Sequence, residues 1–115
     1  HALNAVKAAM DMQNFIAEFS RSKIIQDLPG FEIRIGIHSG SVVSGVVGTK
    51  KFVYDIWGDT VNLASQMEQL GEPGEINISG ETYRLVKDYY NCQYRGKIAV
   101  KGKGDIDMYF VTDKK

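Results

Sequence analysis

The spacing of apolar residues changes abruptly at the segment "DLPG", and this change most constrains the fold. Before it, from residue 2 to about residue 22, apolar side chains recur at helical spacing. Pro29 and Gly30 cannot continue a helix. After them "FEIRIGIH", residues 31–38, alternates strictly between apolar and other side chains, which predicts a half-buried strand. The chain therefore combines a long amphipathic helix with a sheet.

The later segments continue this mixed order. "VVSGVVG" and "FVYDIW" predict two further strands, and Asp59 or Thr60 is expected to cap a helix that runs to about Leu70. "INIS" predicts a short strand, after which Ser79 caps a helix over "GETYRLVKDYY". "CQYRGKIAVK" and "DIDMYFV" predict a closing hairpin around the turn "GKG". Adjacent strands among helices predict an α+β fold, with helices packed on a mostly antiparallel sheet.

Length and charge limit the classes of partner. A chain of 115 residues is one domain or part of one. Its fourteen basic and fourteen acidic residues cancel, so no nucleic-acid partner is expected and any anion binding must be local. The single Cys92 excludes an internal disulfide and a cysteine zinc cluster. No apolar run approaches the roughly 20 residues that span a bilayer, so membrane attachment is expected only through parts outside this chain.

The segment "YDIWGDTVNLASQ", residues 54–66, places polar side chains at a junction between a predicted strand and a predicted helix. Asp55 lies between apolar residues at the strand end, where a carboxylate accepts hydrogen bonds from the amino group of a flat ligand. Asn62 and Gln66 are four residues apart and project together from the helix. Paired amides suit a sugar and a phosphate. A solvated acid at a strand edge and an ordinary polar helix face are the more common explanations of these patterns.

Two other motifs carry possible chemistry. "VKGKG" places Lys101 at a strand end and Lys103 in a glycine turn, where lysines bind phosphate as point charges. A hairpin tip made soluble by lysine explains the same pattern equally well. His38 is predicted to be structural, because no second histidine stands at metal-ligand spacing from it.

Taken together, these stretches resemble the C-terminal part of a class III nucleotidyl cyclase catalytic domain. The matching runs are "FEIRIGIHSGSVVSGVVG", "YDIWGDTVNLASQME", "GEPGEINISGETY" and "VKGKGDIDMYFV", in the order and spacing of the family. The resemblance covers essentially all of residues 1–115, which we expect to be a partial catalytic domain within a longer protein. It implies a ferredoxin-like α+β fold. It also implies cyclisation of a nucleoside triphosphate to a 3′,5′-cyclic monophosphate and pyrophosphate.

The resemblance implies a role for each candidate residue. Asp55 would accept the adenine amino group and favour ATP, because guanine presents a carbonyl oxygen there. The backbone at Ile56 would face the purine, and Asn62 would orient the ribose. Lys101 would hold the terminal phosphates. Gln66 is a departure, since the family usually has an arginine there that stabilises charge on the α-phosphate.

The resemblance also implies a partner and a cofactor. Two cyclase domains pair head to tail, with each active site across the interface, and a homodimer is the expected assembly. The cofactor would be Mg²⁺ or Mn²⁺, held by two aspartates of an upstream segment that this chain does not contain. We therefore expect these 115 residues alone to be inactive. The expected location is the cytoplasm, in a larger membrane or sensor protein.

Two functions from different classes remain open. The first is an adenylate cyclase acting in signal transduction, which the intact Asp55, Asn62 and Lys101 favour. The second is a catalytically degenerate cyclase-like domain acting as a regulatory or dimerisation partner, which Gln66 favours. The signature motifs of diguanylate cyclases and polymerase palm domains, which share the ferredoxin-like fold, are absent from the sequence.

Overall fold

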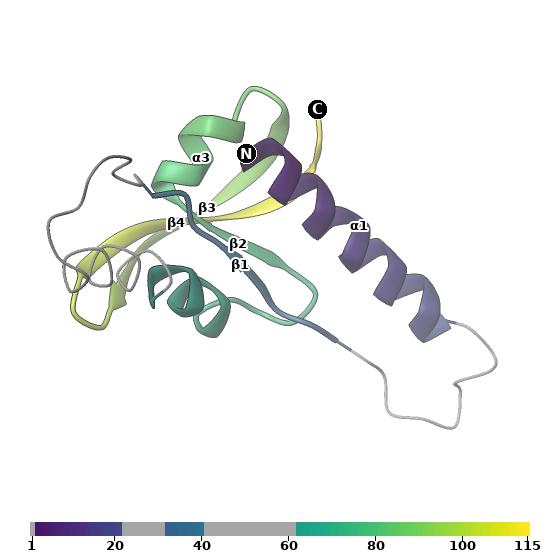
Figure 1. Ribbon diagram of the computed structural model, residues 1–115, viewed down its shortest axis with the longest axis horizontal. Coiled ribbons are helices and arrows are strands. Elements are labelled where there is room, and N and C mark those ends of the chain that lie inside the picture. Colours follow the sequence, from purple (N-terminus) through teal and green to yellow (C-terminus); the bar gives the residue numbers. More distant parts are fainter. Residues whose placement is uncertain (1, 22–31, 41–61) are drawn as a thin grey trace, which may run out of the picture.

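The computed structural model describes residues 2–21, 32–40 and 62–115. These ranges contain helices packed on one sheet, as predicted from the sequence (Figure 1). None of the helices among the described residues is long and apolar enough to span a bilayer. The labelled elements are α1 (Ala2–Arg21), β1 (Ile35–Ile37), β2 (Ile76–Ser79), α3 (Gly80–Val86), β3 (Tyr90–Val100) and β4 (Gly104–Lys114). A further helix, drawn in teal without a label, covers residues 62–69.

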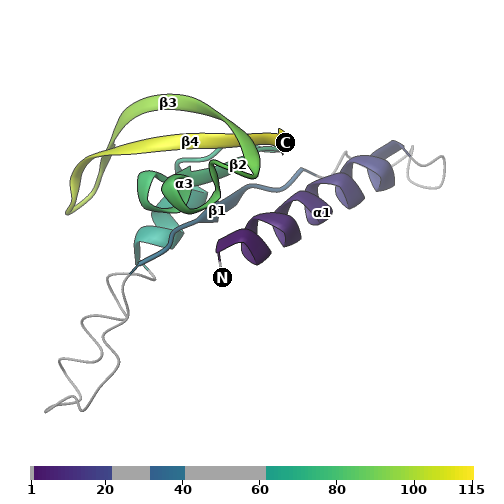
Figure 2. The ribbon, with the colours of Figure 1, turned by 90° about the horizontal axis from the view of Figure 1, so that it is seen from above.

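The sheet has the strand order β1-β2-β4-β3 within the described part of the chain. β1 runs parallel to β2, whereas β4 pairs antiparallel with both β2 and β3. The prediction of a mostly antiparallel sheet is therefore confirmed. β3 and β4 form a long hairpin that curves away from the other strands at its tip (Figure 2).

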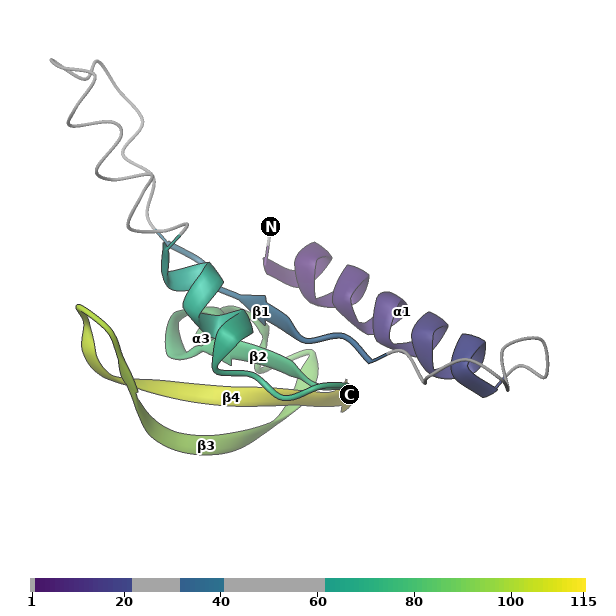
Figure 3. The same cartoon turned by 90° about the horizontal axis from the view of Figure 1, so that it is seen from below.

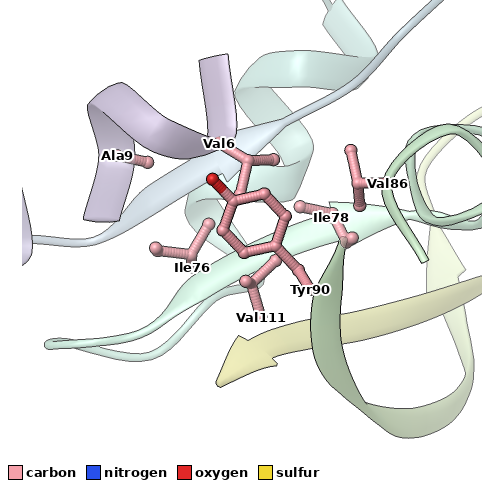
Figure 4. Packing of buried hydrophobic residues seen from close by; sticks show 7 residues of the cluster. All are labelled: Val6, Ala9, Ile76, Ile78, Val86, Tyr90 and Val111. Atoms are coloured by element: carbon pink, nitrogen blue, oxygen red, sulfur yellow. The ribbon is translucent and has the colours of Figure 1, made fainter. Parts of the chain in front are cut away.

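Side chains alternate between the two faces of each strand, so the sheet presents apolar residues on both faces. Both faces are covered by helices. Ile76 and Ile78 of β2 belong to one apolar cluster, which includes residues of α1 and α3 (Figure 4). Met108 of β4 belongs to the other, with Met67 of the helix at 62–69. Figure 3 shows β1 between α1 and the unlabelled helix at 62–69. The first cluster consists of Val6, Ala9, Ile76, Ile78, Val86, Tyr90 and Val111, and the second of Leu63, Met67, Val100 and Met108.

The predicted cap of α3 is confirmed, but two element boundaries differ from the prediction. The Ser79 hydroxyl accepts a hydrogen bond from the Thr82 amide at 3.4 Å. α3 ends at Val86 rather than near Tyr90, because Tyr90 is buried in the first cluster and begins β3.

Of the strand predicted over residues 31–38, only β1 (Ile35–Ile37) is a strand among the described residues. Ile35 pairs with Ile76, the first residue of β2, so the described residues before Ile35 have no residue of β2 opposite them. Upstream of β1, the carbonyl of Ile33 instead accepts hydrogen bonds from the Gly74 amide and the Gln13 side chain. The strands predicted over "VVSGVVG" and "FVYDIW" lie outside the described residues.

Candidate functional site

A pocket of about 440 Å³ lies between the helix at 62–69 and the tip of the β3–β4 hairpin. Asn62, Gln66 and Lys101, three of the five predicted site residues, line it together. The other two, Asp55 and Ile56, lie outside the described residues. The remaining lining residues are Leu63, Val100, Gly102 and Lys103.

The helix presents its two amides to the pocket because its apolar side is fixed on the sheet. Leu63 and Met67 are 8% and 0% exposed and pack in the second cluster. Asn62 and Gln66 each precede one of these residues, so both lie on the flank of the buried stripe. Asn62 is exposed and Gln66 is half-buried. The predicted projection of the two amides to one side is therefore consistent with the packing of the helix.

The hairpin tip brings two cations to the pocket. The Lys103 amide donates to the Val100 carbonyl at 3.0 Å, which closes the turn. Gly102 and Gly104 have φ values of +81° and +76°, in the left-handed region that glycine occupies without a steric penalty. Among the described lining residues there are two lysines, Lys101 and Lys103, and no acid. The pocket therefore suits a polyanion at the hairpin end and a neutral polar group at the helix end.

Three residues that hold the helix at 62–69 were not predicted from the sequence as part of the site. Gly36 of β1 is in close contact with the helix backbone, and Asn77 of β2 and Arg95 of β3 donate hydrogen bonds to its carbonyl groups. The sequence held a signal at Asn77, because a polar residue stands between two isoleucines in the predicted strand "INIS". The structure shows that all four residues of this strand are buried, so the Asn77 side chain needs a hydrogen-bond partner inside the protein. The position of Arg95 within the long hairpin gave no comparable signal.

His38 has a structural position, as predicted. Its Nδ1 lies 2.9 Å from the Ser79 hydroxyl, at the point where β1 and β2 approach the start of α3. The Thr82 hydroxyl donates to the Ser39 hydroxyl at 3.1 Å in the same region. These contacts fasten the end of β1 to α3, and His38 is not among the described residues that line the pocket.

The described residues do not fit a divalent metal ion. Within residues 2–21, 32–40 and 62–115, no three side chains of histidine, cysteine, aspartate or glutamate come together as a set that could hold one. The pocket itself offers amides and ammonium groups, whereas Mg²⁺ prefers carboxylate oxygens. The prediction that the metal ligands come from outside this chain stays a prediction.

Comparison with known proteins identifies the family. A family model described as the adenylate and guanylate cyclase catalytic domain matches residues 1–113. This chain belongs to that family. Adenylate cyclase type 9 of Gallus gallus is 40% identical over 110 residues, which are 95% of this chain and 8% of that protein. An adenylate cyclase of Mycobacterium tuberculosis is 39% identical over 109 residues, which are 93% of this chain and 23% of that protein.

Solved structures confirm the fold. The guanylate cyclase domain of RhGC from Catenaria anguillulae, in complex with GTP, superimposes with a TM-score of 0.78 at 37% identity. That match covers all of this chain and 61% of the solved chain. The predicted α+β cyclase fold is therefore confirmed. The chain spans less than a quarter of the length of these curated relatives and about three fifths of the solved domain. The relatives include cyclases named for adenylate and for guanylate.

Proposed function

We propose that this chain is the C-terminal part of an adenylate cyclase catalytic domain, which converts ATP to 3′,5′-cyclic AMP and pyrophosphate. One observation carries the proposal: Asn62, Gln66 and Lys101 come from segments more than 30 residues apart and line one pocket. Its volume, about 440 Å³, lies within the range of roughly 300–1,000 Å³ that is typical of small-molecule sites. The two lysines at one end support a ligand with several phosphates.

In this proposal each pocket residue has one task. The Asn62 amide orients the ribose, so that the 3′-hydroxyl faces the α-phosphate. The Lys101 ammonium holds the terminal phosphates, which become the leaving pyrophosphate. Gln66 donates a hydrogen bond to the α-phosphate, where negative charge develops during the reaction. A divalent ion, Mg²⁺ or Mn²⁺, would neutralise the phosphates and activate the 3′-hydroxyl, with ligands proposed to lie outside this chain.

The base preference rests on Asp55, which lies outside the described residues. A carboxylate accepts a hydrogen bond from the amino group of adenine, whereas it repels the carbonyl oxygen that guanine presents at the same ring position. The proposal therefore favours ATP over GTP. The proposed assembly is a dimer with a second, identical cyclase domain that completes the site.

Gln66 is the feature that limits the proposed rate. A neutral amide donates a hydrogen bond but brings no positive charge to the α-phosphate. Loss of one such electrostatic contact typically lowers kcat by ~10²–10³. The alternative function, a regulatory cyclase-like domain without turnover, rests on this same position.

The first experiment measures cyclic-nucleotide production by the full-length parent protein. ATP and GTP are offered separately, each with Mg²⁺ and with Mn²⁺. Cyclic AMP from ATP alone is the expected result and would support Asp55 as the base selector. Production of cyclic GMP alone would refute the base assignment. No product from either nucleotide would favour the regulatory alternative.

The limiting role of Gln66 has its own test. We expect Gln66→Arg to raise kcat by at least ~10-fold, because it restores a charge at the α-phosphate. Gln69→Arg is the matched control, since Gln69 is exposed on the same helix and its side chain contacts Ser65 rather than the pocket. Equal kcat values for the parent protein and Gln66→Arg would show that this position does not limit turnover.

A further inference from the structure

We infer that Arg95 and Asn77 are positioning residues of the pocket, because they fix the C-terminal end of the helix that carries Asn62 and Gln66. The effect on turnover rests on the proposed function. The contacts that carry the inference lie at the C-terminal end of this helix, and neither Arg95 nor Asn77 is among the described lining residues.

The C-terminal end of the helix is closed by side chains of the sheet. The last carbonyl groups of an α-helix have no partner within the helix. Here the Asn77 side-chain amide donates to the Met67 carbonyl at 2.9 Å, and Arg95 Nη1 donates to the Leu70 carbonyl at 2.9 Å. A guanidinium is also the favourable charge at this end of a helix dipole. Two strands of the sheet therefore hold the last turn of the helix directly.

The two side chains act as one unit. Arg95 Nη1 also donates to the Asn77 Oδ1 at 2.9 Å, and Asn77 is fully buried. The guanidinium carbon of Arg95 lies 4.2 Å from the centre of the Phe110 ring, an arrangement that stabilises a cation against an aromatic face. Asn77, Arg95 and Phe110 come from β2, β3 and β4. Three strands therefore hold the pair of Asn77 and Arg95 in place relative to the sheet, and this pair limits movement of the helix.

An irregularity in β3 directs Arg95 to this position. The pairing register runs from Tyr94 opposite Tyr109 directly to Gly96 opposite Met108, so Arg95 is the extra residue of a bulge. Gly96 has a φ of +95°, which a residue with a side chain rarely adopts. Bulges redirect side chains and occur often beside functional sites. Here the bulge lets Tyr94 stay with Tyr109 while Arg95 reaches the carbonyl of Leu70.

The consequence reaches the pocket through the helix backbone. Gln66 directly precedes Met67, whose carbonyl Asn77 holds, and Asn62 lies about one turn earlier. Lys101 stands on the separate hairpin tip. Any rotation of the helix therefore moves both amides relative to the rest of the pocket, whichever group holds the phosphates. A displacement of about 1 Å in a reacting geometry can lower the rate by ~10²-fold.

The test uses Arg95→Lys in the full-length parent protein. Lysine keeps the charge but loses the planar group that stacks on Phe110 and donates to both acceptors. We expect kcat to fall by about 10-fold or more. Arg84→Lys is the matched control, because Arg84 is exposed on α3 and pairs only loosely, at 3.9 Å, with Glu81. It should keep the parent activity.

Two double variants separate positioning from a general loss of stability. If Arg95 acts through Gln66, Arg95→Lys should lower kcat less in a Gln66→Ala background than in the parent. In a Lys101→Ala background it should have its full effect, since Lys101 is not carried by this helix. An equal fold-change in all three backgrounds would overturn the inference, because a merely destabilised domain loses activity in every background alike.

Amide hydrogen exchange gives a readout that does not depend on turnover. Arg95→Lys should accelerate exchange at residues 62–70 by about 10-fold, with β2 and β4 unchanged. Unchanged exchange at residues 62–70 would overturn the inference even if activity fell. A parent protein that makes no cyclic nucleotide would refute the proposed function instead, and faster exchange at residues 62–70 would then still support the positioning role.

Discussion

Gly36→Ala tests a close contact between the sheet and the helix that carries the two amides. A Cβ atom at Gly36 would lie 2.0 Å from the Glu68 nitrogen and 2.4 Å from the Met67 carbonyl carbon. Both are backbone atoms of the helix, so rotation of a side chain cannot relieve the overlap. Non-bonded heavy atoms ordinarily lie about 3.5 Å apart or more. To restore that separation from 2.0 Å, the helix must move away from β1 by roughly 1.5 Å.

The expected magnitude follows from this displacement. Overpacking of a core typically costs ~1–3 kcal/mol, and a loosened hydrogen bond costs about 1 kcal/mol more. The hydrogen bond at risk is the one from Asn77 to the Met67 carbonyl, at 2.9 Å. We therefore expect Gly36→Ala to lower the free energy of unfolding by about 2–4 kcal/mol. Turnover should fall by ~10²-fold, because Asn62 and Gln66 move with the helix.

The assay compares Gly36→Ala with Gly80→Ala in the full-length parent protein. A Cβ atom at Gly80 would meet Asp107 Cβ at 3.5 Å, which is an ordinary contact. Both variants add one methyl group, which has room at Gly80 but not at Gly36. Because Gly80 lies in a helix, where alanine is favoured over glycine, Gly80→Ala should not lower the free energy of unfolding. Urea unfolding and cyclic-nucleotide production are measured for both. If the two variants unfolded at the same urea concentration and retained equal activity, the helix would not be seated on β1 as described.

Two further predictions concern the cap of α3 and the acid range. Ser79→Ala removes the acceptor of the Thr82 amide, so the free energy of unfolding should fall by ~1 kcal/mol, measured by urea unfolding; no change would refute the cap. Hydrogen bonds from Tyr94 at 2.7 Å and Lys97 at 3.1 Å hold the pKa of Asp107 below its ordinary value of 3.8. This contribution is present above pH 3.8 and is lost as the pH falls through the lowered folded value. In Asp107→Asn the free energy of unfolding should therefore fall less steeply as the pH is lowered below about 4. The same pH dependence in both proteins would contradict the role of Asp107.

Local patterns predicted the elements well, because each is specified by residues close together in the sequence. The helical spacing before "DLPG" predicted α1, which ends at Arg21, and Ser79 predicted the start of α3. The turn "GKG" predicted the hairpin, whose tip requires left-handed glycines. The end of α3 was predicted too late, because burial of Tyr90 in a core assembled from distant residues outweighs the helical propensity of its neighbours.

The candidate site was predictable only up to the point where distant segments meet. The spacing of Asn62 and Gln66 predicts that the two amides share one side of a helix, but it does not predict what they face.

That direction is set by contacts with residues 10 to 32 positions away: Gly36 allows the close approach, Asn77 holds the Met67 carbonyl, and Arg95 holds the Leu70 carbonyl. None of the three touches the pocket among the described residues. Substitutions at these positions should therefore impair the proposed reaction as strongly as substitution of a residue that contacts the nucleotide, because they move together Asn62 and Gln66, which are the two helix residues proposed to contact it.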